Sequence, residues 1–408
     1  MANLKLSGIN KVYLSGATAL YNINLEARDK EFLVIVGGED SGKSTLLRVI
    51  AGLEEVSSGT VEIGGKDVTE VDPKDRDIAM IFSGNSLYPT FNIFENMAYG
   101  LRIRKAPQAL VEQRVKAAAN ILGLTDVLYR KPKTLTSAAR QRAAIGRAIV
   151  REPRLYLFED PLSGLDEKLR ADMLDVIINL QARMEGTFVY CTKNLAEAMM
   201  IGTRIAVLKD GLLQQVDTPA NLYDYPENAY VAFFIGSPTI NFVKNAKIVK
   251  KDGCYAAESS IGSLPLPENI VARFKDVDSY AGTQREIILG IRPEDAEACK
   301  EGQINAKVGK IQSDGDAVYC ECGLSDGSSM VVRGNDKLIG GEEKAIKADL
   351  TRLYIFDAET RLTLLERDAG YTKTDSPDAD FKPLPFPEEQ EIVEKLKPKK
   401  EKSNKKLR

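Results

Sequence analysis

Over the first 235 residues, short runs of apolar residues alternate with longer segments in which apolar residues recur at helical spacing. In residues 43–53, for example, this helical pattern includes Leu46, Leu47, Ile50 and Leu53. Strand-length runs separated by amphipathic helices are typical of an α/β domain. We therefore expect an α/β domain over residues 1–236. Its predicted strands lie at residues 32–36, 77–82, 155–158, 187–191 and 205–208.

Between about residues 85 and 152 the strand-like runs stop and helical periodicity replaces them. Apolar residues three and four positions apart lie on one face of a helix. This stretch is therefore predicted to be a helical insert in the sheet domain. Its clearest helical pattern comprises Leu110, Val111, Val115, Ala118, Ala119 and Leu122.

The pattern changes again at about Asn241, where short β-like runs begin to alternate with turns. Runs such as 286–289 and 317–320 are separated by clusters of Asp, Gly and Ser, as at 325–328. Many short strands with such turns predict a small barrel or sandwich. We assign this all-β domain to residues 237–370.

The last stretch, residues 371–408, has little apolar content. Three prolines precede a short helical pattern at 388–396, and the chain then becomes rich in lysine. This composition predicts a flexible, charged tail that is largely disordered. Between Lys395 and Arg408 there are eight basic residues and one acidic residue. Two interpretations remain open: a solvated tail, or an electrostatic tether to anionic lipid.

Length and composition agree with a soluble protein of more than one domain. A chain of 408 residues suggests two or three domains. Its net charge of -3 argues against bulk nucleic-acid binding. No apolar run approaches the roughly 20 residues of a membrane-spanning helix, and no signal-peptide pattern opens the chain. The five cysteines form no CxxC pair, which indicates reduced thiols in the cytoplasm.

Histidine is absent from the sequence. Its absence excludes Ser-His and Cys-His nucleophilic systems, together with the most common general base and metal ligand. Any chemistry must therefore use carboxylates, lysine, backbone amides and a bound ion.

Residues 37–44 fit the phosphate-loop pattern GxxxxGK[ST] between a predicted strand and a predicted helix. Glycines let successive backbone N–H groups point at phosphate oxygens, and the helix N-terminus adds a favourable dipole. Lys43 would reach the β- and γ-phosphates, and the Ser44 hydroxyl would bind Mg²⁺. A glycine-rich turn that merely starts a helix is the alternative. The motif residues are Gly37, Gly38, Glu39, Asp40, Ser41, Gly42, Lys43 and Ser44.

Several further short sequences occur in an order and spacing that chance does not produce. They are DRDIAMIF (75–82), LYP (87–89), RQR (140–142), IGRA (145–148), SGLD (163–166) and FIGSP (234–238). Together with the phosphate loop, they make residues 1–370 resemble the ATPase subunits of ABC importers, most closely those of the maltose and glycerol-phosphate type. The sequences LGIRPE (289–294) and LYIFD (353–357) are similar to the regulatory barrel of that family.

The resemblance implies an α/β P-loop NTPase fold of the ABC type, with a helical subdomain and a C-terminal, OB-like regulatory domain. ATP and Mg²⁺ would bind between the phosphate loop of one subunit and the signature loop of another, either a related chain or a second copy. Two transmembrane permease subunits would dock near Ser83 and residues 87–89. They would hold the chain peripherally on the cytoplasmic face of the membrane, and an extracellular solute-binding protein would act indirectly.

The resemblance also implies roles for single residues. Tyr13 would stack on adenine, although by its own sequence context it would be an ordinary packing tyrosine. Thr45 would join the phosphate loop in binding ATP, and Glu159 would join Ser44 as a metal ligand. The residues that would contact the ATP of the partner subunit are Leu135, Thr136, Ser137, Ala138, Ala139 and Asp166.

Two binding loops depart from the family pattern. Asp40 stands where the family usually has glycine, and its carboxylate would repel bound phosphate. The signature loop, usually Leu-Ser-Gly-Gly-Gln, is here residues 135–139, in which Thr136 keeps a hydroxyl. We expect weakened rather than abolished nucleotide contacts.

The catalytic positions depart further. Ser83 replaces a glutamine, Lys193 replaces a histidine, and the usual Asp-Glu pair is reversed to Glu159-Asp160. Asp160 is one methylene shorter than the expected general base, and a displacement of about 1 Å can lower the rate about 100-fold. Lys193 can hold phosphate as a point charge but does not change protonation near pH 7. We expect these positions to catalyse ATP hydrolysis only weakly.

Three hypotheses follow from these departures. The chain could be the hydrolysis-impaired half of an ATPase heterodimer in an importer, for which a sugar is the expected solute. It could instead be an active, self-pairing ATPase with unusual residues. A scaffold or regulator that no longer binds nucleotide is the third.

Overall fold

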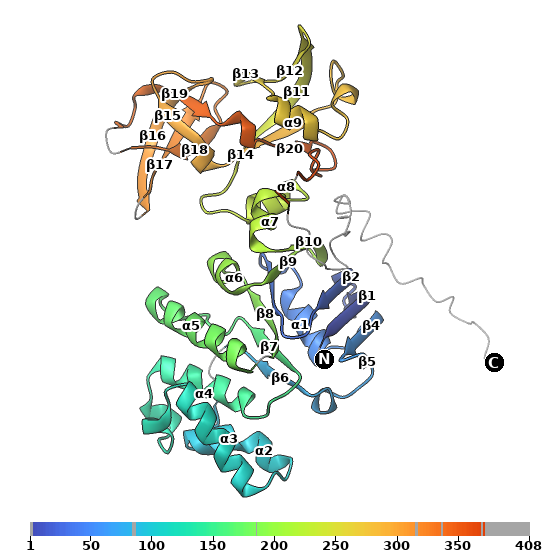
Figure 1. Cartoon of the computed structure of the whole chain (residues 1–408), viewed down its shortest axis with the longest axis vertical. Helices are drawn as coiled ribbons and strands as arrows, with labels where there is room; N and C mark the ends of the chain where they lie inside the picture. The colour runs from blue at the N-terminus through green and yellow to red at the C-terminus, as the bar shows by residue number, and fades with distance from the viewer. Residues whose placement is uncertain are drawn as a thin grey trace, which may run out of the picture. The chain divides into compact units, whose positions relative to one another are not determined.

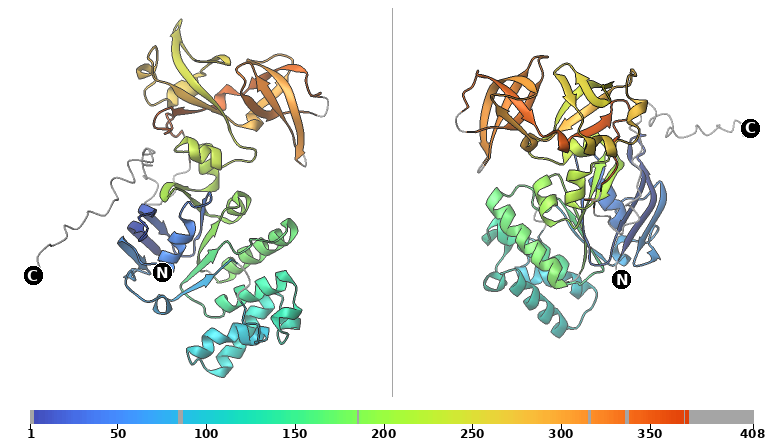
Figure 2. Two further views of the ribbon diagram at one scale, coloured as in Figure 1. Left: turned by 180° about the vertical axis from the view of Figure 1, so that it is seen from behind. Right: turned by 45° about the horizontal axis from the view of Figure 1, so that its top comes forward.

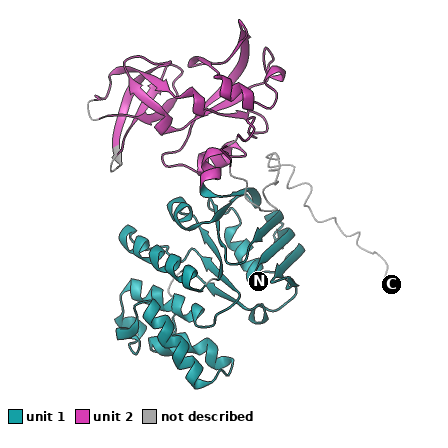
Figure 3. Ribbon diagram, in the orientation of Figure 1, with its two compact units in different colours: residues 1–219, 374–381, 389–408 teal, residues 220–373, 382–388 magenta. Residues whose placement is uncertain are grey.

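The computed structural model describes residues 3–83, 87–184, 186–314, 317–335, 338–368 and 370–371. Two compact units divide the chain (Figure 3): the first extends to Pro219, and the second begins at Ala220 and includes the last described residues. The predicted domain boundary after residue 236 remains a prediction. Apart from Tyr371, the predicted tail at 371–408 lies outside the described residues.

A six-stranded sheet forms the centre of the first unit. Its strand order is β10-β9-β3-β8-β7-β6, with β10 antiparallel to β9 and the other five strands parallel. These five parallel strands coincide with the five predicted runs, because strands buried on both faces read as continuous apolar sequence. The bounds are β3 (Phe32–Gly37), β6 (Ile78–Ile81), β7 (Leu155–Glu159), β8 (Thr187–Thr192), β9 (Arg204–Lys209) and β10 (Leu212–Asp217).

Local backbone geometry explains why two elements are shorter than predicted. Strand β6 starts after Asp77, whose φ of +54° is incompatible with extended backbone. Helix α1 (Lys43–Ala51) stops two residues before the predicted end because Gly52 adopts a φ of +76°. The Gly52 N–H donates to the carbonyls of Arg48 and Val49, which caps the helix.

A second, antiparallel sheet lies in the first unit and has no counterpart among the predicted strands. Its order is β2-β1-β4-β5. Side chains from this sheet, from α1 and from the central sheet share one core; Leu6, Leu47 and Val189 are examples. The bounds are β1 (Leu4–Val12), β2 (Thr18–Ala27), β4 (Ser58–Ile63) and β5 (Lys66–Asp67).

The predicted helical insert is confirmed by α2 (Ile93–Ile103), α3 (Gln108–Ile121) and α4 (Ser137–Ile149). These helices group together beside β6, at one end of the central sheet (Figures 1 and 2). They pack closely at Gly146, where an added Cβ would lie 2.8 Å from Met97 and 3.1 Å from Leu122. Helices α5 (Glu167–Met184) and α6 (Leu195–Ile201) flank β8 along the chain.

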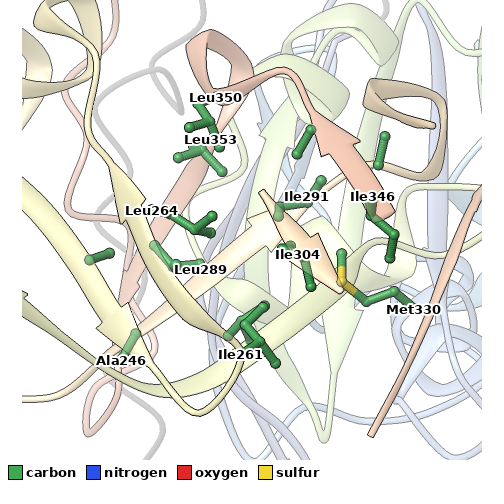
Figure 4. Close-up of a cluster of buried hydrophobic side chains, with 14 of the residues drawn as sticks. Ala246, Ile261, Leu264, Leu289, Ile291, Ile304, Met330, Ile346, Leu350 and Leu353 are labelled. Atoms are coloured by element: carbon green, nitrogen blue, oxygen red, sulfur yellow. The ribbon is translucent and has the colours of Figure 1, made fainter. Parts of the chain in front are cut away.

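The second unit contains an open sheet, in the order β13-β12-β11-β14-β20, and a closed barrel, in the order β15-β18-β17-β16-β19. Figure 4 shows that Leu264 and Leu289 of the sheet and Met330 and Ile346 of the barrel belong to one buried cluster. The predicted all-β character of this region is confirmed, and of the two expected architectures, barrel or sandwich, the structure contains a barrel beside an open sheet. The strands are β11 (Asn241–Lys251), β12 (Cys254–Ser259), β13 (Gly262–Pro265), β14 (Ile287–Ile291), β15 (Ala296–Cys299), β16 (Ile304–Asp314), β17 (Ala317–Leu324), β18 (Ser329–Arg333), β19 (Glu343–Ala348) and β20 (Tyr354–Asp357).

Three short helices complete the second unit: α7 (Pro219–Asp224), α8 (Ala229–Phe234) and α9 (Glu268–Arg273). The fully buried Arg292 guanidinium donates to the carbonyls of Tyr223, Ala232 and Ile235, which fastens α7 and α8 to the end of β14. All five cysteines are free thiols. Among the described residues, we find no helix that is both long and apolar enough to cross a bilayer.

Candidate functional site

The loop between β3 and α1 curls around the amino group of Lys43. The Lys43 Nζ donates to the carbonyls of Gly37 and Gly38, at 2.8 and 2.5 Å, and lies 2.9 Å from the Ser41 Oγ. Burial lowers the pKa of Lys43, because a partly buried ammonium loses hydration. The loop therefore holds a cationic group at the N-terminus of α1, where the helix dipole also favours anions.

Two glycines allow this curvature. An added Cβ on Gly37 would lie 2.3 Å from the carbonyl oxygen of Leu208. Gly42 has a φ of +94°, and its Cβ would lie 2.5 Å from the carbonyl oxygen of Ala19. Asp40 also has a positive φ, +56°, in a region that L-residues other than Asn and Asp rarely occupy. The loop therefore needs glycine at positions 37 and 42 and accepts aspartate at 40 with some strain.

The loop forms one wall of a cavity of about 300 Å³ at the carboxyl ends of the parallel strands. Ligand sites of open α/β sheets usually lie at this edge. Residues more than 100 positions apart in the sequence meet here. The described lining residues are Glu39, Asp40, Lys43, Ser44, Glu159, Asp160, Cys191, Thr192 and Lys193.

The two carboxylates at the end of β7 have different surroundings. The buried Glu159 carboxylate forms an ion pair with Arg48 of α1, at 3.2 Å between Oε1 and Nη2. Within the described ranges, no side-chain hydrogen bond or ion pair engages the carboxylate of Asp160. Burial raises the pKa of Asp160, while the cationic Lys193 and Lys43 act in the opposite direction.

The opposite wall, at the end of β8, is built by Cys191, Thr192 and Lys193. Burial raises the pKa of the Cys191 thiol well above its usual range, so this cysteine remains a neutral thiol. The Lys193 Nζ lies 3.7 Å from the Glu39 carboxylate, and both side chains are largely exposed. An exposed pair of this kind contributes little to stability, so Lys193 is free to turn toward an anion.

Tyr13 lies beside the first turn of α1, where its hydroxyl is 3.2 Å from the Thr45 Oγ1. Its ring is about one third exposed, and the Lys11 Nζ lies 5.1 Å from the ring centroid. The ring is thus held next to the phosphate loop with part of its surface open.

Comparison with known proteins agrees with this geometry. A family model described as ABC transporter matches residues 20–163. The oligosaccharides import ATP-binding protein MsmX of Bacillus subtilis (strain 168) is 41% identical over 373 residues, covering 89% of this chain and 100% of MsmX. The osmoprotective compounds uptake ATP-binding protein GgtA of Synechocystis is 39% identical, in an alignment that covers 88% of this chain and 98% of GgtA. This chain belongs to the ABC transporter ATP-binding family.

A solved structure supports the fold of the first unit. The structure of cbiO1 from Clostridium perfringens, part of the ABC transporter complex cbiONQ, matches with a TM-score of 0.51 and 22% identity. The superimposed region covers 54% of this chain and 90% of cbiO1. The α/β P-loop NTPase fold of the ABC type, predicted from the sequence, is confirmed.

The predicted signature loop and the loop around Lys43 do not line the same cavity within the described part of this chain. Thr136 caps helix α4 by accepting a hydrogen bond from the Ala139 N–H, at 3.2 Å. Asp166 likewise accepts from the Leu169 N–H at the start of α5. None of these residues is among the described lining of the cavity, and neither is the exposed Ser83. Gln141 of α4 donates to the Pro161 carbonyl, which links α4 to the segment that follows β7.

The oxygen donors around the cavity can accommodate Mg²⁺. This ion prefers hard oxygen ligands, usually one or two carboxylates together with phosphate oxygens. Ser44 is exposed in the first turn of α1, and in the described part of the chain no side chain pairs with the Asp160 carboxylate. Glu159 would have to leave Arg48 to bind the ion.

Sequence reasoning missed three residues that shape this site: Arg48, Cys191 and Thr192. Arg48 lies four positions after Ser44, and residues at that spacing share a helix face, which was an available signal. Cys191 and Thr192 end a predicted strand, and strand ends gather at one edge of a parallel sheet. Neither signal shows that Arg48 pairs with Glu159.

Proposed function

We propose that this chain is the nucleotide-binding subunit of an ABC importer for a sugar or oligosaccharide. The observation that carries this proposal is a glycine-dependent loop around Lys43, in a chain that aligns with all of MsmX. The name of that relative refers to oligosaccharide import, and its similarity extends through the second unit as well as the ATPase unit. ATP would bind with its phosphates on residues 37–45, and Tyr13 would stack on the adenine.

Mg²⁺ would accompany the nucleotide. The cavity lining holds two lysines, Lys43 and Lys193, and four carboxylates, of which Glu159 is already paired with Arg48. A triphosphate adds further negative charge, so a divalent ion would offset its repulsion from Asp40 and Asp160.

The binding proposal is tested by calorimetric titration with ATP, with and without Mg²⁺. We expect measurable binding in both conditions and tighter binding with Mg²⁺. Lys43→Ala should remove the affinity, whereas Lys66→Ala, an equal loss of charge on the exposed strand β5, should leave it unchanged. Absence of binding at millimolar ATP would favour the hypothesis of a scaffold or regulator.

We further propose that the chain is the hydrolysis-impaired half of an ATPase heterodimer. Ser83, Asp160 and Lys193 replace the family residues that handle the attacking water, and loss of a positioned general base lowers rates about 10²- to 10⁴-fold. The partner ATPase would supply an intact set. Two transmembrane permeases would couple closure of the pair to transport and hold the chain at the cytoplasmic face of the membrane, and a solute-binding protein would act outside.

An active homodimer is the alternative, and steady-state turnover of the isolated chain distinguishes the two. We expect turnover far below about 1 s⁻¹, which is the low end of ordinary enzymes. A rate at or above this value would favour the homodimer.

A further inference from the structure

The two adjacent carboxylates at the end of β7 are held in different ways. Glu159 extends toward α1 and forms its ion pair with Arg48, with only 8% of the Glu159 side chain exposed. A charge-assisted contact of this kind is stronger than a neutral hydrogen bond. Without Arg48, the buried Glu159 carboxylate would have no compensating charge, which is unfavourable.

Side-chain length explains why this pair can form. Arg48 lies one helical turn beyond Ser44 on α1, and it is not among the described residues that line the cavity. Glutamate carries one methylene more than aspartate. At the end of β7, that extra reach lets the Glu159 carboxylate meet the guanidinium of Arg48.

Asp160 is fixed by its backbone rather than by its side chain. Its N–H donates to the Cys191 carbonyl at 2.8 Å, and its own carbonyl accepts from the N–H and the hydroxyl of Ser163, at 3.2 and 3.0 Å. Its φ of +43° turns the chain sharply after β7. The carboxylate is left without a side-chain partner in the described structure, and it lines the cavity with Lys43, Ser44 and Lys193.

We propose that Asp160, and not Glu159, is the carboxylate that binds the divalent ion of this chain, and that Arg48 is a positioning residue that holds Glu159 away from it. This inference rests on the proposed function, because the ion would arrive with the nucleotide. It reverses the sequence-based expectation for Glu159. It also gives a physical reason for weak hydrolysis: with Asp160 on the ion and Glu159 on Arg48, neither carboxylate is left to orient water.

The test measures the magnesium gain, defined as the ratio of ATP dissociation constants without and with Mg²⁺. Asp160→Asn should reduce this gain by about tenfold, whereas Glu159→Gln should change it less than about threefold. Glu159→Gln keeps an oxygen that can accept from Arg48, so its fold is preserved. Asp252→Asn, in the turn between β11 and β12, is the matched control for an unrelated aspartate.

A double variant tests the positioning role of Arg48. Arg48→Gln releases Glu159, which can then bind the ion. The magnesium gain of the double variant Arg48→Gln/Asp160→Asn should therefore be larger than that of Asp160→Asn alone. Mn²⁺ bound with ATP and observed by electron paramagnetic resonance gives an independent readout of the same ion. Circular dichroism of each variant confirms folding.

The outcomes separate this inference from the proposed function. Loss of the magnesium gain in Glu159→Gln, with the gain retained in Asp160→Asn, overturns the assignment to Asp160. ATP binding with no magnesium gain in the unmodified chain overturns the inference but leaves nucleotide binding intact. No ATP binding in either condition overturns the proposed function itself.

Discussion

The hydroxyl of Tyr190 donates a 2.9 Å hydrogen bond to Oε2 of Glu197, a carboxylate that is only 3% exposed. The Thr192 hydroxyl donates to the same oxygen, also at 2.9 Å, and the Arg170 Nε lies 3.2 Å from the other. Glu197 therefore ties β8, α5 and α6 together, and one of its partners, Thr192, directly precedes Lys193 in the chain.

Protonation of Glu197 should influence stability. Burial raises the pKa of Glu197 above its usual value, and the nearby Asp160 adds to this shift. The hydrogen bonds from Thr192 and Tyr190 and the charge of Arg170 act in the opposite direction. The folded state therefore binds the proton more readily than the unfolded state. Relative to Glu197→Gln, which cannot titrate, the chain should gain stability as pH falls from neutral toward the unfolded-state pKa of about 4.3.

Urea unfolding of both proteins at pH 7.5 and pH 5 measures this effect. The chain has no tryptophan, so circular dichroism is the appropriate signal. We expect the stability of the unmodified chain relative to Glu197→Gln to be higher at pH 5 than at pH 7.5. Glu268→Gln, on helix α9, is the matched control. A difference that is constant or moves the other way contradicts the role of burial at Glu197.

Asp40→Gly should strengthen ATP binding. Asp40 has a positive φ that glycine adopts without strain, and its carboxylate lies beside the phosphate-binding loop. We expect about tenfold tighter binding without Mg²⁺, and a smaller effect with Mg²⁺, because the ion already screens the carboxylate. Calorimetry provides both values.

The control for Asp40→Gly is Asp252→Gly, which makes the same change at a φ of +50° in the second unit. It should leave ATP affinity unchanged. Equal effects of the two substitutions would mean that backbone relief in general, and not the charge at the loop, is responsible.

Restoring the family residues should raise turnover. The four substitutions are Ser83→Gln, Glu159→Asp, Asp160→Glu and Lys193→His. Aspartate at 159 is too short to keep the contact with Arg48, and glutamate at 160 regains the reach of the general base. Because these groups act together, the combined variant should exceed the product of the single effects, by steady-state phosphate release. Unchanged turnover in the combined variant would place the defect elsewhere.

Pairing with an intact partner should produce two unequal ATP sites. The site on this chain's phosphate loop should hold ATP and scarcely cleave it. The other site uses the partner's water-handling residues and this chain's signature loop, residues 135–139. Loss of one stabilising donor in that loop lowers the rate of hydrolysis about 10²- to 10³-fold. That second site should therefore carry nearly all hydrolysis.

Transport by the assembled complex tests this asymmetry. Removing the general-base glutamate of the partner should abolish transport, whereas Asp160→Ala in this chain should scarcely change it at millimolar ATP. Transport that collapses in Asp160→Ala, while this chain still binds ATP with Mg²⁺, would show that Asp160 is a catalytic base, and the impaired-half hypothesis would be wrong.

The sequence predicted the parts of the fold that carry strong local signals. Strands such as β3 and β8 are buried along their whole length, so they appear as unbroken apolar runs. The strands β1 and β2 were not predicted, because their burial is partial and their pairing contains several register shifts that disturb the two-residue period. Only packing against α1 and the central sheet shows which of their faces is buried.

The phosphate loop can be predicted from the sequence, because the motif at 37–44 is contiguous and its glycines are required by backbone geometry at that point. The sequence also determined which family residues are replaced, including the reversal at Glu159 and Asp160. Tertiary structure alone decided what the two carboxylates contact. Arg48 and Glu159 are 111 residues apart, and their meeting depends on how α1 packs against β7. Side-chain pairing across that distance depends on the packed arrangement of the elements, which no local sequence pattern specifies.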